Sequence, residues 1–287
     1  NMSLGLTLSG GGVKGAAHIG ALKALEEEKI KVDYIGGTSS GSIVATLYAT
    51  GYKPDEIYSI FKKYCKNIKY VDVKNIFKLI LGLITTGTIV IDGLNSGKSI
   101  NKLINKMCNE KNVYNISDVK MSLVIPTVNM CTGEVVCFTS SKIRAFSDNT
   151  IFLNDAEIGS VVQASCSFPT VFSPCDYNGE KLIDGGVREN VPWREVKFLG
   201  ADKVISIIFE NEVDKNCCKN LVDVAFRSFE LKNKELSKYE LNGSDYFIKI
   251  KSEKVSLLDM SKIDEFYELG YNEAKQFLKE NKNKLFN

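Results

Sequence analysis

The chain has 287 residues, of which 44% are hydrophobic, and this is enough for one or two domains with a substantial core. The formal net charge at pH 7 is only +2, and lysine outnumbers arginine by 33 to 4. Because few guanidinium groups are present to bind phosphates and bases in a bidentate way, the composition does not indicate nucleic-acid binding.

Metal binding through nitrogen or sulfur is not indicated either. The eight cysteines form no C-x-x-C pair, and His18 is the single histidine. Zinc sites need more ligands than this pattern offers, so we expect reduced thiols and no metal or other cofactor. The N-terminus enters a strand-like stretch without the basic and apolar regions of a signal peptide, which predicts a cytoplasmic protein.

The chain opens with a strand over residues 4–8, a glycine loop over 10–15, a helix that reaches about residue 29, and a strand over 32–35. This βαβ order favours a parallel sheet covered by helices. Small residues on the helix, Gly20 among them, predict that it lies close to the sheet.

The next stretch, residues 35–51, predicts a strand, a sharp turn and a helix, with Ser39 at the turn. Gly37, Ser39 and Gly41 form a G-x-S-x-G pattern, in which glycines relieve crowding around a serine on a strained turn. Gly51 can end the helix in a left-handed conformation. Because a helix N-terminus favours an alkoxide, the spacing suits a nucleophile, although a plain Gly/Ser-rich turn would look the same.

Pro54 begins a further helix, and the stretch from about 72 to 95 is more apolar than the rest. It is too short and too interrupted to span a bilayer. The stretch is preceded and accompanied by lysines at positions 62, 63, 66, 69, 74 and 78. Two interpretations stay open: an apolar cap or membrane contact beside a basic surface, or an ordinary buried helix with a solvated lysine face.

The remaining elements continue the α/β alternation. Asn178-Gly179 indicates a hairpin whose second strand ends at Asp184, followed by Gly185 and Gly186. The pattern predicts helices over 99–109, 155–165 and 263–280, and strands over 121–125, 134–138, 172–177, 180–183, 204–209 and 246–250. We therefore expect an α/β fold of three layers with a mostly parallel central sheet.

Nucleotide binding is an alternative that the glycine loop raises. Gly10, Gly12 and Gly15 match G-x-G-x-x-G, and Asp33 lies near the distance expected of a ribose-binding acid. Asp33 precedes its strand instead of ending it, however, and that strand leads into Ser39. The stretch 93–99 resembles a phosphate-binding loop but is one residue short, so we interpret it as the entry to a helix.

The search for a catalytic base is more informative. No histidine follows Ser39, and His18 precedes it among small residues of the first helix. A carboxylate would then have to take the serine proton, and Asp184 is the best-placed candidate, with a pKa that desolvation would raise. The N–H groups of Gly10, Gly11 and Gly12 can form an oxyanion hole, with Lys14 adding positive potential.

Three motifs taken together resemble the patatin-like phospholipase family: residues 10–15, 37–41 and 184–186. The stretches 164–169 and 258–271 are also similar to bacterial members, so the resemblance covers nearly the whole chain. It implies one domain over 1–287, Ser39 as nucleophile and Asp184 as base. It further implies an oxyanion hole at Gly10, Gly11 and Gly12 beside Lys14, with the remaining motif glycines at Gly15, Gly37, Gly41, Gly185 and Gly186. Many relatives have alanine where this chain has Gly186.

The function that the resemblance implies is a serine acyl hydrolase that needs no metal. It would cleave fatty acyl esters of phospholipids, lysophospholipids or related lipids through an acyl-enzyme, with peripheral membrane contact. The alternatives are a non-hydrolytic lipid-binding or regulatory member and, less favoured, a dinucleotide-binding protein.

Overall fold

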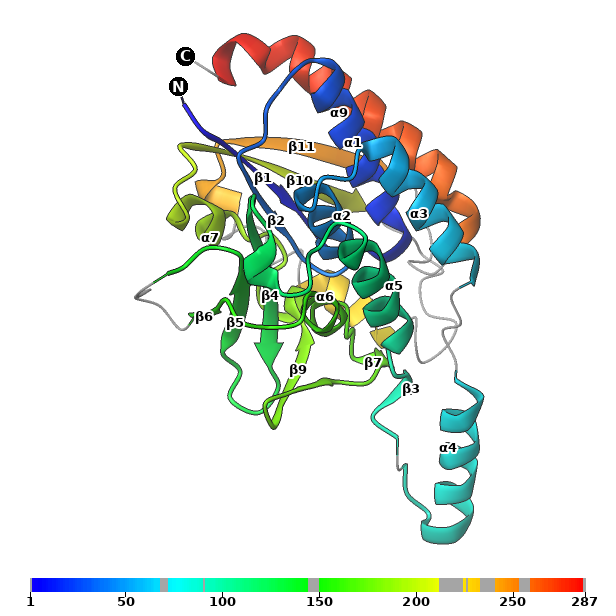
Figure 1. Cartoon of the computed structure of the whole chain (residues 1–287). Helices are drawn as coiled ribbons and strands as arrows, with labels where there is room; N and C mark the ends of the chain where they lie inside the picture. The colour runs from blue at the N-terminus through cyan, green and yellow to red at the C-terminus, as the bar shows by residue number, and fades with distance from the viewer. Residues whose placement is uncertain are drawn as a thin grey trace.

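The computed structural model shows a mostly parallel sheet with helices on both faces, as the α/β alternation predicts (Figure 1). Position 69, named above, and positions 90 and 258, which fall within the stretches 72–95 and 258–271, lie outside the described part of the chain. The structure describes residues 2–67, 72–89, 91–143, 150–211, 224–225, 227–232, 241–252 and 259–285.

The central sheet has the strand order β11-β10-β1-β2-β4-β5-β6. Pairing is parallel from β11 to β4, antiparallel between β4 and β5, and parallel again between β5 and β6. A separate short ladder joins β3 to β7. The strands are β1 (Leu4–Leu8), β2 (Tyr34–Gly37), β3 (Gly93–Asn95), β4 (Ser122–Asn129), β5 (Val135–Thr139), β6 (Thr150–Leu153), β7 (Thr170–Phe172), β8 (Cys175–Tyr177), β9 (Glu180–Asp184), β10 (Lys203–Asn211) and β11 (Tyr246–Ser252).

Most helices of the described ranges lie close to where the sequence predicts them. The short helix α7 was not predicted; it packs on one face of the sheet, where Gly5 and Gly36 leave room for Val196. The helices are α1 (Gly15–Glu27), α2 (Ser40–Ala49), α3 (Pro54–Asn67), α4 (Val73–Thr86), α5 (Lys98–Asn109), α6 (Ile158–Ser165), α7 (Trp193–Phe198) and α9 (Ile263–Leu285), with 3₁₀ turns at Gly12–Lys14, Ile116–Asp118, Gly185–Val187, Leu241–Gly243 and Met260–Lys262.

The small residues of α1 serve a contact that the sequence did not predict. A Cβ atom added to Gly20 would lie 2.0 Å from the Tyr267 carbonyl oxygen, and one added to Gly270 would lie 1.9 Å from the Ala17 carbonyl oxygen. At Gly20 the close neighbour is therefore α9 and not the sheet. Two glycines facing each other let the helix backbones touch, which puts the long C-terminal helix directly over α1.

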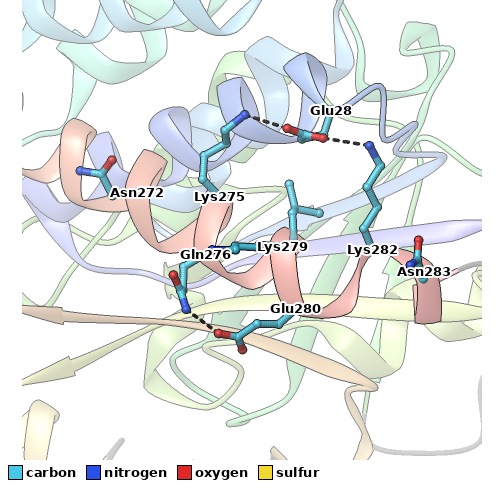
Figure 2. A pocket seen from close by; sticks show the side chains of 9 residues that line it. Glu28, Asn272, Lys275, Gln276, Lys279, Glu280, Lys282 and Asn283 are labelled. Atoms are coloured by element: carbon cyan, nitrogen blue, oxygen red, sulfur yellow. Dashed lines mark hydrogen bonds and ion pairs between the residues drawn. The ribbon is translucent and has the colours of Figure 1, made fainter.

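Ion pairs continue this contact at the surface (Figure 2). Glu28 accepts from the Nζ atoms of Lys275 and Lys282, both at 2.8 Å. The hollow beside them has a volume of about 590 Å³ and is lined mostly by polar and charged residues of α9. None of the predicted site residues lines it.

The sheet topology brings the ends of two strands together. β2 pairs with the first part of β4, where Gly36 lies beside Val124, and then leaves the sheet. The vacated edge of β4 is taken by antiparallel β9, in which Asp184 lies beside Thr127. β2 and β9 therefore meet end to end, three residues apart along β4. Ser39 comes two residues after the end of β2, and Asp184 is the last residue of β9.

The predicted hairpin is confirmed and sets the position of β9. β8 and β9 pair antiparallel, and their connection has left-handed residues at Asn178 (φ 51°) and Gly179 (φ 85°). Two consecutive positive φ values are typical of the turn that matches strand twist in tight hairpins.

The apolar stretch 72–95 forms α4 and β3, and α4 projects from the body of the molecule (Figure 1). The interpretation of an ordinary buried helix is wrong, because the side chain of Ile84 is 76% exposed. Of the lysines around it, Lys62 pairs with Asp264 at 2.7 Å, while the side chains of Lys66 and Lys69 are not among those described.

Candidate active site

Ser39 occupies the turn between β2 and α2 in a strained backbone conformation, with φ 53° and ψ −125°. Both flanking glycines are sterically required there. A Cβ atom at Gly37 would lie 2.3 Å from the Gly41 carbonyl oxygen, and one at Gly41 would lie 2.3 Å from the Leu8 carbonyl oxygen. Strain of this kind persists only where the surroundings enforce it, and it is concentrated at functional sites.

Hydrogen bonds hold this turn in place. The Ser39 N–H donates to Ser165 Oγ at 3.1 Å, and Ser165 Oγ donates to the Pro126 carbonyl oxygen at 2.8 Å. Ser42 Oγ donates to the Ser39 carbonyl oxygen at 2.6 Å. Since α2 begins at Ser40, the Ser39 side chain lies at a helix N-terminus, where the helix dipole stabilises negative charge.

Asp184, the last residue of β9, is buried with 2% of its surface exposed. Its Oδ1 accepts a hydrogen bond from the Gly186 N–H at 2.8 Å. Burial raises the pKa of Asp184 to about 7, while the nearby Ser39 side chain and the Gly186 N–H act in the opposite direction. A carboxyl with this pKa can accept and return a proton near neutral pH.

The side chains of Ser39 and Asp184 lie beside each other. The Ser39 hydroxyl is close enough to lower the pKa of Asp184, yet Oδ2 accepts no hydrogen bond of ordinary geometry from the described residues. The orphaned Oδ2 is thus an unused acceptor beside the nucleophile.

The glycine loop lies against this pair. A Cβ atom on Gly10 would be 3.1 Å from Ser39 Cβ, so the loop borders the nucleophile directly. The Gly10 N–H donates to Asn190 Oδ1 at 3.0 Å, whereas within the described part of the chain we find no acceptor for the N–H groups of Gly11 and Gly12. Gly12 has φ 59°, which favours glycine.

Lys14 is buried beneath the loop and does not extend into solvent. Its side chain is 1% exposed, and Nζ lies 5.8 Å from the centre of the Phe209 ring. The same ring packs against Gly11, where a Cβ atom would approach it to 2.7 Å. Gly15 lies against the start of α2, because a Cβ atom added to it would be 3.0 Å from Ser40 Cβ. Lys14 therefore lies directly beside the loop, where it was predicted to act.

His18 supports the loop from below. It is fully buried, and its Nε2 lies 2.7 Å from the Ser9 carbonyl oxygen, so Nε2 carries the proton and donates it. Burial lowers the pKa of His18 to about 4, so the ring is neutral at physiological pH. A neutral imidazole bound to the residue before Gly10 fits a structural role.

Two residues beside the site were not singled out from the sequence. Asn190 reaches the loop from the segment after the Asp184 motif. Cys166 is buried with its Sγ 3.8 Å from Ser42 Oγ, and burial together with the charge of Asp184 raises the pKa of its thiol. Cys166 lies within the stretch 164–169 that carries part of the family resemblance; Asn190 had no signal of its own.

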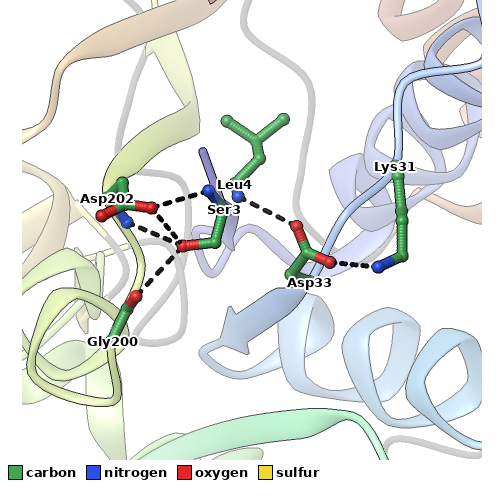
Figure 3. A network of polar contacts seen from close by, with 6 residues as sticks. All are labelled: Ser3, Leu4, Lys31, Asp33, Gly200 and Asp202. Atoms are coloured by element: carbon green, nitrogen blue, oxygen red, sulfur yellow. Dashed lines mark hydrogen bonds and ion pairs between the residues drawn. The ribbon is translucent and has the colours of Figure 1, made fainter. Parts of the chain in front are cut away.

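Asp33 does not lie near the glycine loop, contrary to what a dinucleotide site requires; it contacts Leu4 and Lys31, as Figure 3 shows. Its Oδ2 accepts from the Leu4 N–H at 3.1 Å and its Oδ1 pairs with Lys31 Nζ at 2.5 Å. Leu4 begins β1, while the loop follows the other end of that strand. Asp33 therefore stabilises the start of β1 and is too far from the glycine loop to bind a ribose there. This argues against the dinucleotide interpretation.

No three His, Cys, Asp or Glu side chains of the described ranges come together as a metal site would need. Within the same ranges, no helix combines the length and the apolar character required to cross a membrane.

The site of this α/β protein combines a serine on a strained strand-to-helix turn, a buried carboxyl at the end of a neighbouring strand and a glycine loop beside the serine. The chain matches the model of the patatin-like phospholipase family over residues 6–197. It belongs to that family, as the three motifs predicted.

The curated relatives are much longer proteins. The chain is 30% identical over 207 residues to the lysophospholipase NTE1 of Debaryomyces hansenii, a match that covers 72% of this chain and 12% of the relative. It is 25% identical over 310 residues to the lysophospholipase NTE1 of Lodderomyces elongisporus, covering 99% of this chain and 20% of the relative. The chain thus spans a fifth or less of these two relatives.

Solved structures with the same fold include VipD from Legionella pneumophila, with a TM-score of 0.56 at 18% identity, covering 98% of this chain and 67% of VipD. The ExoU–SpcU complex from Pseudomonas aeruginosa matches with a TM-score of 0.52 at 18% identity, covering 97% of this chain and 51% of the other. At this identity the likeness concerns the fold alone.

Proposed function

We propose that this chain is a serine acyl hydrolase in which Ser39 and Asp184 form a catalytic dyad. The observation that carries the proposal is the pairing of a strained Ser39 with a buried carboxyl whose pKa is about 7. No histidine follows Ser39 in the sequence, and His18 is bound to the loop backbone. Asp184 is therefore the group that takes the serine proton.

The reaction proceeds in two halves. Asp184 Oδ2 takes the hydroxyl proton as Ser39 Oγ attacks the ester carbonyl carbon, and the resulting tetrahedral intermediate expels the alcohol, which receives that proton. A water molecule then gives a proton to Asp184 and attacks the acyl-enzyme. Release of the fatty acid returns the proton to Ser39 Oγ.

The glycine loop stabilises the negative oxygen of the intermediates. The N–H groups of Gly11 and Gly12 are unused within the described part of the chain, and the Gly10 N–H becomes available when Asn190 releases it. The N-terminus of α2 and the buried cation of Lys14 add positive potential. Loss of one such donor costs about 3–4 kcal/mol of transition-state stabilisation.

The substrates we propose are fatty acyl esters of lysophospholipids, phospholipids or related lipids. Support comes from family membership and from the relatives named lysophospholipase NTE1. We further propose that the chain meets such lipids at a membrane surface without a metal or other cofactor.

Hydrolysis of lysophosphatidylcholine and of acyl esters of graded chain length tests this function. The wild-type protein should release fatty acid, and Ser39→Ala should lower the rate at least about a thousandfold, because the nucleophile is absent. Equal activity of the two proteins would reject Ser39 as the nucleophile.

One observation favours a second candidate, a non-hydrolytic lipid-binding or regulatory member of the family. The Gly10 N–H already has an acceptor, which would leave an oxyanion hole incomplete if Asn190 never released it. A serine-reactive fluorophosphonate separates the two candidates: covalent labelling of Ser39 supports the hydrolase, and unlabelled protein that still binds lipid supports the alternative.

A further inference from the structure

Helix α4 is specified by its own sequence but lies outside the main core. Asp72 caps its N-terminus by accepting from the Lys74 N–H at 2.9 Å, and Gly87 ends it in the left-handed conformation with φ 67°. Its main packing partner is the short strand β3. In Figure 1 it extends away from the sheet and the other helices.

The orientation of this helix is the reverse of that in a globular core. The side of α4 that carries Asn75 and Gly82 faces β3: Asn75 Nδ2 donates to the Gly93 carbonyl oxygen at 3.0 Å, and Gly82 is buried. Its apolar side chains face outward instead, and they include Phe77, which is 65% exposed, and Ile84. A surface helix ordinarily shows the opposite arrangement, with the apolar stripe against the protein.

The exposure is concentrated in this one segment. Of the fifteen large hydrophobic side chains that are exposed in the described ranges, eight belong to residues 73–89. They are Val73, Ile76, Phe77, Ile80, Leu81, Leu83, Ile84 and Ile89. A contiguous apolar surface of this kind marks an interaction site.

The charges beside this surface indicate which partner covers it. Lys74 and Lys78 lie on the polar side of α4 and are exposed, and between Asp72 and Asp92 the sequence has no acidic residue. Both flanking carboxylates are engaged, since Asp72 caps the helix and Asp92 accepts from Ser173 Oγ at 2.7 Å. An apolar face flanked by lysines without carboxylates is complementary to anionic lipid.

The length of α4 suits a position in the plane of a bilayer surface. Fourteen residues extend about 21 Å, which is less than the roughly 30 Å hydrocarbon thickness that a spanning helix needs. Lysines on the sides of such a helix extend their charged ends to the lipid phosphates while the apolar face enters the acyl region.

Hydrogen bonds connect this helix to the candidate active site. The Asp72 N–H donates to the Leu94 carbonyl oxygen at 2.9 Å, and the Ser173 N–H donates to the Asn95 carbonyl oxygen at 2.8 Å, so α4 is attached through β3 to β7. The segment that precedes β7 reaches the site, because Ser167 accepts from the Asp184 N–H at 3.1 Å.

We propose that α4 is a membrane-docking helix, which places its outward apolar face in the surface of an anionic lipid bilayer and so brings the site at Ser39 to that surface. The binding is independent of catalysis. The delivery of lipid substrate rests on the proposed hydrolase function.

Vesicle co-sedimentation of the Ser39→Ala protein tests the docking without degrading the lipid. We expect binding to phosphatidylcholine vesicles that contain about one third phosphatidylglycerol, and weaker binding to phosphatidylcholine alone. Phe77→Glu with Ile84→Glu should reduce binding about a hundredfold. The matched control, Tyr114→Glu with Met130→Glu, changes side chains that are 57% and 58% exposed elsewhere and should bind normally.

A failure of docking can be told apart from a failure of hydrolysis. With Ser39 intact, the α4 double variant should hydrolyse a soluble short-chain ester at the wild-type rate but lose vesicle hydrolysis, and an unchanged melting temperature would show that it folds. Equal vesicle binding by the α4 variant and the wild type would overturn the proposal. The proposal would also be overturned if neither protein bound vesicles and the wild type formed a dimer that the two α4 substitutions dissociate.

Discussion

Asp184 is the side chain whose protonation should set the pH dependence of activity. Burial raises its pKa to about 7, and the base form is the ionised one. We therefore expect kcat/KM on a soluble ester to fall about tenfold per pH unit below 7 and to be constant above it. Rates measured between about pH 5 and 9 check this, and a profile that is flat down to pH 5 would mean that Asp184 is not the base.

The same pKa has a consequence for stability. Because the pKa of Asp184 is higher in the folded protein than in the unfolded chain, the folded state binds the proton more tightly, and stability is lost as the pH rises through about 7. Asp184→Asn removes this cost. At pH 8 it should raise the free energy of unfolding by about 2–4 kcal/mol, or the melting temperature by about 5 °C.

Melting curves at pH 8 and pH 5 measure this effect. The gain of Asp184→Asn should shrink as the pH is lowered, since the wild-type carboxyl becomes protonated in the folded state. Ser39→Ala serves as the control, because it removes activity without removing the titrating group. A gain that is equal at both pH values would show that the ionisation of Asp184 is not its cause.

At the scale of single elements, the turn between β2 and α2 depends on two glycines. Gly41→Ala would place a methyl group 2.3 Å from the Leu8 carbonyl oxygen and so displace Ser39. A displacement of about 1 Å can cost about a hundredfold in rate, so we expect at least a tenfold loss of kcat. Gly51→Ala, at the other end of α2, meets nothing within 4 Å; its φ of 95° makes the variant less stable, but kcat of the folded protein should be unchanged. Comparable kcat values for the two variants would contradict this account.

The crossing of α1 and α9 makes a separate prediction about stability. Gly270→Ala would place its methyl group 1.9 Å from the Ala17 carbonyl oxygen and force the helices apart. Such overpacking should lower the free energy of unfolding by about 2–4 kcal/mol. Lys279→Ala, an exposed position on the same helix, should change it by less than about 0.5 kcal/mol. Denaturant titrations compare the two, and equal stabilities would show that the crossing is not tight.

At the scale of the whole molecule, local signals in the sequence predicted most of the elements. The hairpin at Asn178-Gly179 and the helix beginning at Pro54 follow from turn chemistry and from the fixed φ of proline. The turn at Ser39 follows from its two glycines. Each of these features depends on a few neighbouring residues, so it can be recognised without knowledge of the fold.

The features that escaped prediction depend on distant parts of the chain. Asn190 reaches Gly10 across 180 positions of sequence, and Gly20 faces α9 near the other end of the chain. The outward apolar face of α4 was left open between two interpretations, because periodicity identifies an apolar stripe but not the side on which the protein lies. Contacts of this kind are fixed by the topology of the sheet and by helix packing.

Independence from metal ions is a further prediction for the molecule as a whole. The proposed reaction uses a hydroxyl, a carboxyl and backbone N–H groups, and each proton is held by Ser39 or Asp184. Dialysis against a chelator should therefore leave the hydrolysis of a soluble ester unchanged. A loss that is restored by one divalent cation would show that a metal takes part.

The measurement that tests the central claim most directly is ester hydrolysis by Asp184→Asn beside His18→Gln. The dyad predicts that Asp184→Asn lowers kcat at least about a thousandfold, since no other group takes the serine proton. His18→Gln should retain most activity, because an amide can still donate to the Ser9 carbonyl oxygen. The reverse ranking, with Asp184→Asn active and His18→Gln inactive in a folded protein, would contradict the account.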